Sequence, residues 1–168
     1  MRIALILVGR TIPGFNDLLD TVNHTFRAKV SMSSADFPKT KSFNPSRKQY
    51  EAEPLLQELV PLAPDADIRL FITREDLFSE PFDFVFGVTL GKNCIVSTAH
   101  LDPRFYGEKD GASLFKERVM KEVLHELGHA MGMLHCEDKK CVMVFSNSVA
   151  GVDFKGKELC GRCRKFAH

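Results

Sequence analysis

The stretch HELGHAMGMLHC, residues 125–136, constrains the fold of this chain more than any other part of its sequence. His125 and His129 are four residues apart, so on a helix they differ by about 40° around the axis and by about 6 Å along it. Both imidazoles then share one face and can bind a single metal ion at about 2.1 Å. If the helix continued, His135 would lie about 9 Å beyond His129 along the axis, too far to join the same ion.

Gly132 stands where the chain can leave this helix. Glycine adopts the left-handed conformation of a helix C-terminus without a Cβ penalty, so the backbone can reverse there and return His135 to the ion. Three histidine ligands leave a fourth position open for water, which is typical of a catalytic zinc site and not of a structural one. Glu126 lies about 100° from His125 around the helix, so it can act as a general base on a zinc-bound water without being a ligand.

An accidental spacing of surface or core histidines is the alternative interpretation. A bare H-E-x-x-H occurs by chance, but the extended H-E-x-x-H-x-x-G-x-x-H fixes five of the eleven positions from 125 to 135. On a helix, this longer pattern favours metal binding.

Four of the five cysteines form two close pairs, Cys136 with Cys141 and Cys160 with Cys163, separated by eighteen residues. Two such pairs match a closed structural zinc site in which each pair supplies two corners of a tetrahedron. Disulfides would need an oxidising compartment, for which the sequence gives no sign, and free thiols are the other alternative. Cys94 falls in a strand pattern and is expected to be an inert buried residue.

Residues 133–168 contain too few apolar side chains to form a core of their own. A bound zinc ion can contribute on the order of 10 kcal/mol towards ordering such a segment. Because Cys136 directly follows His135, folding of this tail around its zinc would also hold His135 and Met143 in position. The sequence thus predicts two zinc ions per chain, one catalytic and one structural, at coupled sites.

The rest of the chain alternates strand and helix patterns. We expect strands at 3–9, 28–34 and 68–73, and helices at 13–28 (opened by Pro13), 50–62 and 113–131. Residues 82–90 and 94–100 predict a β-hairpin or two adjacent strands around the turn at 91–93. Strands that first alternate with helices and then pair with each other indicate an α/β or α+β fold with strands of mixed direction.

The length of 168 residues, with 44% apolar and 27% charged residues, suits one ordered domain. We expect a single domain over 1–168, with an N-terminal lobe at 1–132 and a small C-terminal lobe at 133–168. The net charge of +1 gives no reason to expect nucleic acid or an anionic membrane as a partner. No apolar stretch approaches the ~20 residues of a membrane span, and the short run after Arg2 lacks a signal-peptide cleavage site. A cytoplasmic location is therefore expected.

The extended histidine motif resembles that of the metzincin clan of metallopeptidases, and Met143 in CVMVF stands where the clan has its Met-turn methionine. With the C-x4-C-x-Met after the third histidine and the distal C-x-x-C, residues 125–163 look like those of the archaemetzincins. The resemblance implies a compact metzincin-like α/β fold, a mixed twisted sheet with flanking helices, and a zinc peptidase. By this resemblance, the ligands of the catalytic zinc are His125, His129 and His135, and Glu126 is the base. The four paired cysteines would bind the structural zinc.

The sequence departs from the metzincin pattern in two places. Many other metzincins carry a tyrosine just after the Met-turn methionine, whereas Val144 to Asn147 supply none here, so no phenol is available there to stabilise an oxyanion. Most secreted metzincins have a latency segment, whereas this fold is expected to start at residue 3. How the activity is restrained is left open.

The predicted reaction is hydrolysis of a peptide bond by a zinc-activated water, with Glu126 accepting a proton and passing it to the leaving amine. A peptide substrate would lie extended along an edge strand, for which residues 94–100 are the candidate; a purely structural strand is the alternative. His100 is expected at the surface, without a catalytic role. Substrate preference, endo- versus aminopeptidase action and the oligomeric state have no recognisable signature in the sequence.

Two other functions are compatible with the sequence. A non-catalytic zinc protein could use its cysteine-bound tail, with the basic RCRK at 162–165, to bind nucleic acid. Against this, Glu126 and an open fourth ligand position would have no use in a pure binder. A hydrolase of small amides is the other alternative, because the sequence does not reveal the width of the cleft.

Overall fold

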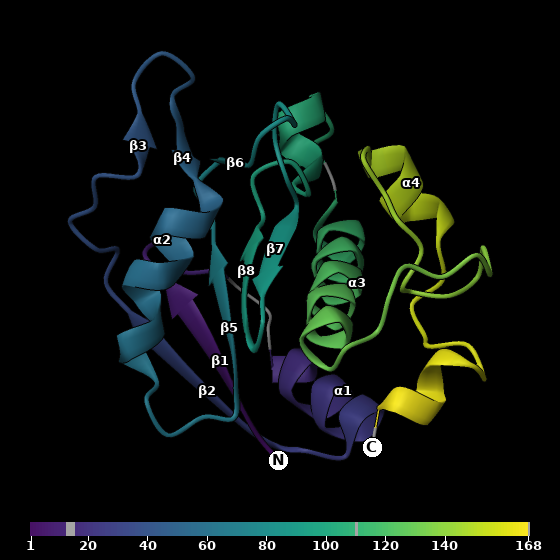
Figure 1. The fold of residues 1–168 in the computed structure, drawn as a ribbon. Helices are drawn as coiled ribbons and strands as arrows, with labels where there is room; N and C mark the ends of the chain where they lie inside the picture. Colours follow the sequence, from purple (N-terminus) through teal and green to yellow (C-terminus); the bar gives the residue numbers. More distant parts are fainter. Residues whose placement is uncertain (13–15, 110, 168) are drawn as a thin grey trace.

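The computed structural model describes residues 1–12, 16–109 and 111–167 and has an α/β architecture (Figure 1). Its main sheet contains five strands in the order β2-β1-β5-β8-β7. The bounds of these strands are β1 Arg2–Val8, β2 Lys29–Ala35, β5 Ile68–Thr73, β7 Gly87–Leu90 and β8 Asn93–Ser97. A second, smaller sheet has the order β3-β4-β6 and consists of β3 Phe43–Asn44, β4 Gln49–Glu51 and β6 Leu77–Phe78.

Four strands of the main sheet run parallel, and β7 alone runs antiparallel to its neighbour β8. Parallel strands are usually covered on both faces and therefore read as continuous apolar runs. In β1, Ile3 and Leu5 face one hydrophobic core, while Ala4 and Ile6 face the other. The unbroken IALILV run is the consequence of this double burial.

Helices cover both faces of the main sheet (Figure 1). α1 Asn16–Phe26 and α3 Ala112–Ala130 pack on one face, and α2 Ala52–Leu59 packs on the other. The remaining described helices are short: α4 Val149–Phe154 and 3-10 turns at Val60–Leu62, Pro103–Tyr106 and Cys163–Phe166. None of the helices in the described part of the chain combines the length and apolar character that a membrane crossing requires.

Most elements occur where the sequence predicts them, and the predicted fold class is confirmed. The histidine-bearing helix covers 112–130, against an expectation of 113–131, and β7 and β8 form the expected hairpin around Gly91. The helix expected at 50–62 is shorter, because Tyr50 pairs within the small sheet and the chain tightens into a 3-10 turn after Leu59. The helix start predicted at Pro13 lies outside the described residues.

The edge of the main sheet differs from the prediction. Residues 94–100 were the candidate edge strand, but β8 lies between β5 and β7, so this prediction is wrong. β8 pairs in parallel with β5 along its whole length and is almost entirely buried, whereas the more exposed β7 lies outside it. A hairpin pattern identifies two neighbouring strands, but only the pairing with β5 decides which of them is internal.

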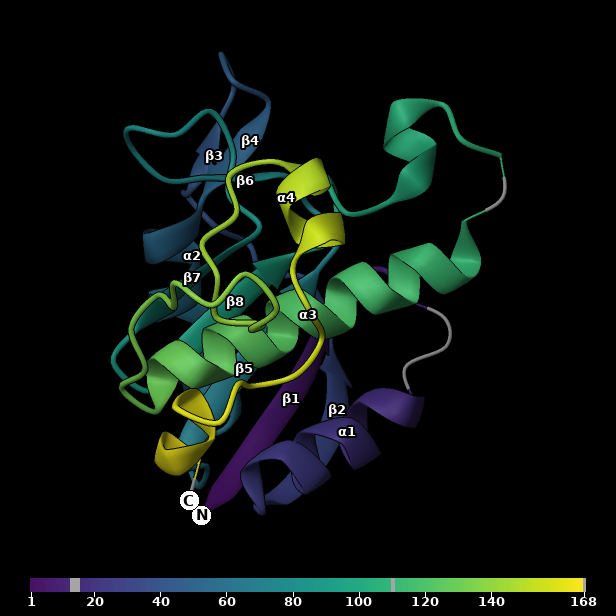
Figure 2. The same cartoon turned by 90° about the vertical axis from the view of Figure 1, so that its right-hand side faces the viewer.

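The segment after α3 runs back across that helix instead of forming a separate layer (Figure 2). Val142, Met143, Val152 and Leu159 are each no more than 4% exposed and belong to the same core cluster as the apolar face of α3. The tail therefore depends on α3 for its apolar contacts.

Two ion pairs also join the C-terminal segment to α3. Arg118 Nε lies 2.7 Å from an oxygen of Asp153. Lys155 Nζ lies 2.8 Å from Glu122 Oε1, and the side chains of this second pair are 0% and 4% exposed. A buried pair of this kind depends on both partners, since either charge alone would be desolvated without compensation.

Replacing Lys155 with alanine is expected to lower the free energy of unfolding by about 3–5 kcal/mol, because the buried carboxylate of Glu122 loses its counter-charge. Urea denaturation at neutral pH, followed by circular dichroism, measures this change. Lys157→Ala is the matched control: it removes an exposed ammonium two residues away and should change stability by less than about 0.5 kcal/mol. An equally small effect of both substitutions would contradict the prediction.

Candidate metal centre

Helix α3 brings the first two histidines of the motif together. His125 and His129 are one helical turn apart, and their Nε2 atoms lie 3.0 Å from each other. The rings are nearly perpendicular, with centroids 4.6 Å apart. Two ring nitrogens thus point at one small volume beside the helix.

Gly132 carries the reversal that brings in the third histidine. Its φ angle is +90°, in the left-handed region, and α3 ends two residues before it. The turn is closed by the backbone N–H of Met133, which donates to the carbonyl of Gly128 at 3.0 Å. The chain then returns His135 to within 4.8 Å of both other imidazoles, measured between candidate ligand atoms.

The hydrogen bonds of His125 and His129 fix which nitrogen carries the proton. His125 Nδ1–H donates to the carbonyl of Val142 and His129 Nδ1–H donates to the carbonyl of Met133, each at 2.9 Å. A carbonyl can only accept, so the proton of each neutral ring is on Nδ1 and both Nε2 atoms present lone pairs. Two lone pairs converging at 3.0 Å fit a cation held between them.

The pKa values of the three imidazoles are lowered, which favours the neutral form that a metal ligand requires. Burial is the main cause that lowers the pKa of each ring, and for His125 the nearby Lys155 ammonium adds to the effect and takes the pKa well below its ordinary value. Neutral imidazoles are the form that binds metal. A set of three nitrogen donors fits zinc with one position left for a further ligand.

Glu126 lies next to this histidine set but is not part of it. Its side chain is buried, with 5% exposed, and its Oε2 accepts a hydrogen bond from Thr89 Oγ1 at 2.6 Å. Burial raises the pKa of this carboxyl to about 8. A dication at the neighbouring histidines would favour the ionised form by direct attraction.

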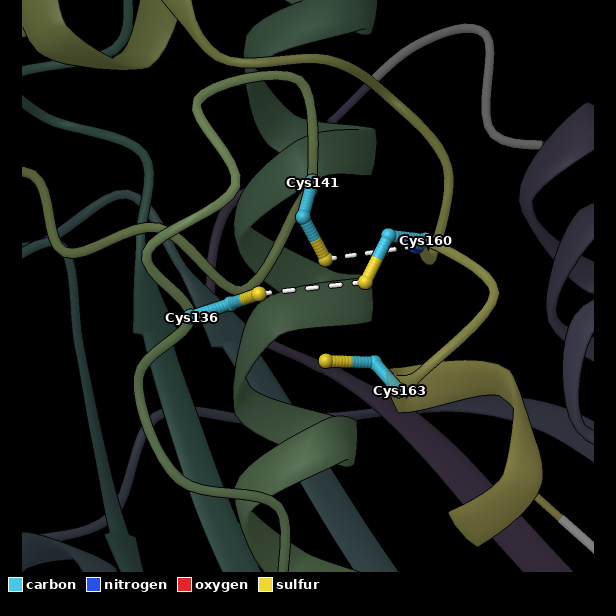
Figure 3. Close-up of side chains that lie close together, drawn as sticks. All are labelled: Cys136, Cys141, Cys160 and Cys163. Carbon is cyan, nitrogen blue, oxygen red and sulfur yellow. Dashed lines mark hydrogen bonds between the residues drawn. The ribbon is translucent and has the colours of Figure 1, made fainter.

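The four paired cysteines form a second cluster. Figure 3 shows their sulfur atoms pointing towards a common centre, and all four lie within 4.8 Å of one another. The Sγ atoms of Cys136 and Cys160 are 3.8 Å apart. This separation fits a tetrahedron of thiolates at the zinc–sulfur distance, whose edge is about 3.8 Å. The fifth cysteine, Cys94, is fully buried elsewhere, as expected, and all five are free thiols.

Backbone and side-chain donors support the cysteine cluster. Burial raises the pKa of the Cys136 thiol, but hydrogen bonds led by that from Arg162, at 3.4 Å, outweigh it and bring the pKa to about 7. The backbone N–H of Cys160 donates to Cys141 Sγ at 3.3 Å. Such donors favour the thiolate form that a metal requires.

The residues between the two clusters connect them through the backbone. Val142 accepts from His125 through its carbonyl, while its own N–H donates to the carbonyl of Glu158 at 2.9 Å. The N–H of Cys136 donates to the carbonyl of Met143, also at 2.9 Å. One short stretch, 141–143, therefore contacts both the histidine set and the cysteine cluster.

A cleft of about 700 Å³ opens in front of the histidines. Its lining includes residues 82–89, from β7 and the segment before it, together with residues 132–135 and 145–147. Three large apolar side chains are exposed here: Phe82 at 46%, Phe145 at 51% and Leu134 at 84%. Exposed apolar side chains that gather at a cleft are typical of a binding surface.

His100 is not at the surface, so the expectation for this residue is wrong. It is 9% exposed, its Nε2 lies 3.0 Å from both carboxylate oxygens of Asp76, and its ring stacks on Phe84 with centroids 3.9 Å apart. These partners lie up to 24 residues away in the sequence. Its surroundings could not be inferred from the local strand pattern.

Four residues that shape the site were not singled out in the sequence: Gly87, Thr89, Gly128 and Lys155. Gly128 had a usable signal, because a glycine inside a helix costs about 1 kcal/mol relative to alanine and needs a packing reason. Gly87 had one as well, because a glycine inside a strand pattern indicates a bulge or a close approach of another group to the backbone. Thr89 and Lys155 had none. Thr89 is 37 residues from Glu126, and Lys155 is 30 residues from His125, whose Nδ1 lies 3.4 Å from the ammonium.

Comparison with known proteins gives consistent matches. The sequence pattern of peptidase family M54 matches residues 18–167. Archaemetzincin from Sulfolobus acidocaldarius is 46% identical over 124 residues, which are 72% of this chain and 70% of that protein. The crystal structure of a zinc-dependent peptidase from Methanocorpusculum labreanum has a TM-score of 0.89 at 28% identity, covering 99% of this chain and 100% of that one. Archaemetzincin from Methanopyrus kandleri has a TM-score of 0.85 at 34% identity, covering 99% and 93%.

Gly128 is expected to be required because of Met143. A Cβ at position 128 would lie 2.3 Å from Met143 Sδ, so Gly128→Ala should lower the melting temperature despite a gain in helix propensity of about 1 kcal/mol. In a Met143→Ala background the clash is absent, and the same substitution should raise the melting temperature. Scanning calorimetry of the two pairs measures both signs. A loss of equal size in both backgrounds would disprove the packing explanation.

Proposed function

The chain belongs to peptidase family M54, the archaemetzincins, and on that premise we propose that it hydrolyses peptide bonds at the three-histidine centre with zinc as its catalytic metal. One observation carries the proposal. Two Nε2 atoms with their protons on Nδ1 converge at 3.0 Å, and the buried Glu126, the residue after His125, lines the same cleft. This arrangement suits a cation with a neighbouring base and has no use in a metal-free binder.

The histidine set provides the proposed metal ligands. His125, His129 and His135 would hold the ion, with Val142 and Met133 keeping the first two rings in the required tautomer. When bound, zinc supplies Lewis acidity, which lowers the pKa of a coordinated water towards ~7 and polarises the scissile carbonyl.

Glu126 is the proposed general base. It follows His125 on α3 and is not part of the three-histidine set, so it would flank the ion without being a ligand. In the proposed reaction it accepts a proton from the attacking water and passes it to the leaving amine. The closed surroundings of the carboxylate limit its access to bulk water, so the proton is retained for this transfer.

The peptide is proposed to lie along β7. This strand is the outer strand of the main sheet on the cleft side, and among the described residues no strand pairs with its outer edge. An extended peptide can add main-chain hydrogen bonds to such an edge. The exposed Phe82, Phe145 and Leu134 at the cleft would contact substrate side chains.

The cysteine cluster is the proposed site of a second, structural zinc. Cys136, Cys141, Cys160 and Cys163 would close its coordination sphere, leaving no position for water. The ion would order the lobe formed by residues 133–168, which shares its apolar core with α3. Through residues 141–143, this ordering would also hold the Val142 carbonyl against His125.

Glu126→Ala is expected to lower peptide cleavage by about 10²- to 10⁴-fold, which is the usual contribution of a general base. Zinc-loaded wild type and variant are incubated with a diverse peptide library, and the products are counted by mass spectrometry. Glu58→Ala, on the exposed face of α2, is the control and should cleave like wild type.

The remaining outcomes of this experiment separate the alternatives. Cleavage by both Glu126→Ala and wild type would refute the assigned base. No cleavage of any peptide by the zinc-loaded wild type would refute the peptidase and favour a binding module or a hydrolase of small amides.

Metal analysis of the purified chain is expected to give about two equivalents of zinc, one removed easily by a chelator and one resistant. Replacing Cys160 and Cys163 together by serine should release about one equivalent and weaken retention of the other. Cys94→Ala, which removes a thiol outside the cluster, should retain both. Full occupancy of both sites in the double variant would refute the coupling.

A further inference from the structure

The edge strand β7 touches Glu126 at two points. The first is the hydroxyl of Thr89, which donates to Glu126 Oε2 at 2.6 Å. The same hydroxyl oxygen lies 3.2 Å from the backbone carbonyl of Glu126. Among the described residues, no other side chain donates a hydrogen bond to this carboxylate.

The second point is Gly87, two residues earlier and therefore on the same face of the strand. A Cβ built at this position would lie 2.7 Å from both Cγ and Oε1 of Glu126. The carboxylate thus packs directly against a backbone that has no side chain. With any other residue at position 87, the Glu126 side chain would have to move, because it is the flexible partner of this contact.

These two contacts determine where the Glu126 carboxylate points. Glu126 has three rotatable side-chain bonds, and the helix alone does not determine where its carboxylate points. Thr89 holds one oxygen, and Gly87 leaves room for the other. Both residues line the same cleft as the histidines.

We propose that β7 positions the general base, with Thr89 orienting the Glu126 carboxylate and Gly87 providing the space that it occupies. The proposal rests on the proposed function, in which Glu126 is that base. It gives β7 two tasks: the strand along which the peptide lies also aims the group that acts on it. Thr89 and Gly87 are positioning residues that act through Glu126.

Steady-state kinetics on a cleaved library peptide, with zinc-loaded protein, tests this proposal. Thr89→Val should lower kcat by about 10- to 100-fold, as is usual for loss of a supporting hydrogen bond, with KM nearly unchanged. Thr89→Ser keeps the hydroxyl and should restore most of kcat. Gly87→Ala should lower kcat by about 100-fold, because it displaces the carboxylate. Zinc content should be that of wild type in all three.

Thr73→Val is the matched control. It also removes a hydrogen-bonded threonine hydroxyl from the main sheet, but in β5 and away from the base; this hydroxyl is buried and accepts from the N–H of Glu75 at 3.2 Å. Its kcat should equal that of wild type. If Thr89→Val and Thr73→Val give the same kcat, or if Thr89→Ser is as slow as Thr89→Val, the positioning role is refuted.

A second measurement does not depend on activity. Urea midpoints of wild type, Thr89→Val, Glu126→Ala and the double variant form a cycle that isolates the contact between the two side chains. The effect of Thr89→Val should be clearly smaller in the Glu126→Ala background. Strictly additive midpoints would overturn the proposal.

The outcomes separate this proposal from the proposed function. Full activity of Glu126→Ala would refute the base itself, whatever the result at Thr89. An inactive Glu126→Ala together with an unaffected Thr89→Val would refute only the role of β7.

Discussion

Two backbone carbonyls that fix the protonation of two imidazoles are the interaction on which the rest of the site depends. The carbonyls of Val142 and Met133 accept the Nδ1 protons of His125 and His129, so two unprotonated Nε2 atoms face each other at 3.0 Å. Lone pairs at this separation repel each other, and a cation between them turns the repulsion into coordination. Neither carbonyl belongs to the helix that carries the histidines. Met133 follows the reversal at Gly132, and Val142 belongs to the docked C-terminal segment. The helix therefore supplies the two imidazoles, but residues that follow the helix hold them in the tautomer that can bind a metal ion.

The buried carboxyl groups of α3 likewise depend on partners that come from outside the helix. Glu122 and Glu126 are four residues apart on α3, and both are buried, so two carboxyl groups lie on the same side of the helix. Like charges at this spacing are unfavourable unless each is compensated. Lys155 pairs directly with Glu122, at 2.8 Å, whereas Glu126 has a hydrogen bond from Thr89 and only the more distant attraction of the same ammonium. In the proposed function, the dication at the neighbouring histidines supplies the missing positive charge. In that proposal, the carboxylate that has no lysine of its own is thus the one that acts in the reaction.

The features that could be inferred from the sequence lie within short stretches of consecutive residues. The spacing of His125 and His129, the turn at Gly132 and the close pairs of cysteines each occupy a few consecutive residues, and backbone geometry over that range is nearly determined by residue type. The errors came from pairings between distant segments. Whether β7 or β8 forms the edge depends on the parallel pairing of β8 with β5, and the burial of His100 depends on Asp76 and Phe84. Thr89 and Lys155 had no local signal, because a threonine in a strand and a lysine after a short helix are ordinary residues until their partners on α3 are known.

The site consequently has two halves with different physical origins. Glu126, Thr89 and Gly87 belong to α3 and the sheet, whose geometry is set by a large apolar core. His135 and the Val142 carbonyl belong to the segment after Gly132, whose apolar contacts come from α3 and whose remaining order is proposed to come from zinc at the cysteine cluster. Metal binding that requires a folded segment adds its free energy to the folding of that segment. Under this proposal, the position of His135 varies with zinc occupancy of the cysteine cluster, whereas the position of Glu126 does not. Disturbing the tail should therefore act on metal retention, and disturbing β7 should act on the chemical step, although both line the proposed catalytic centre.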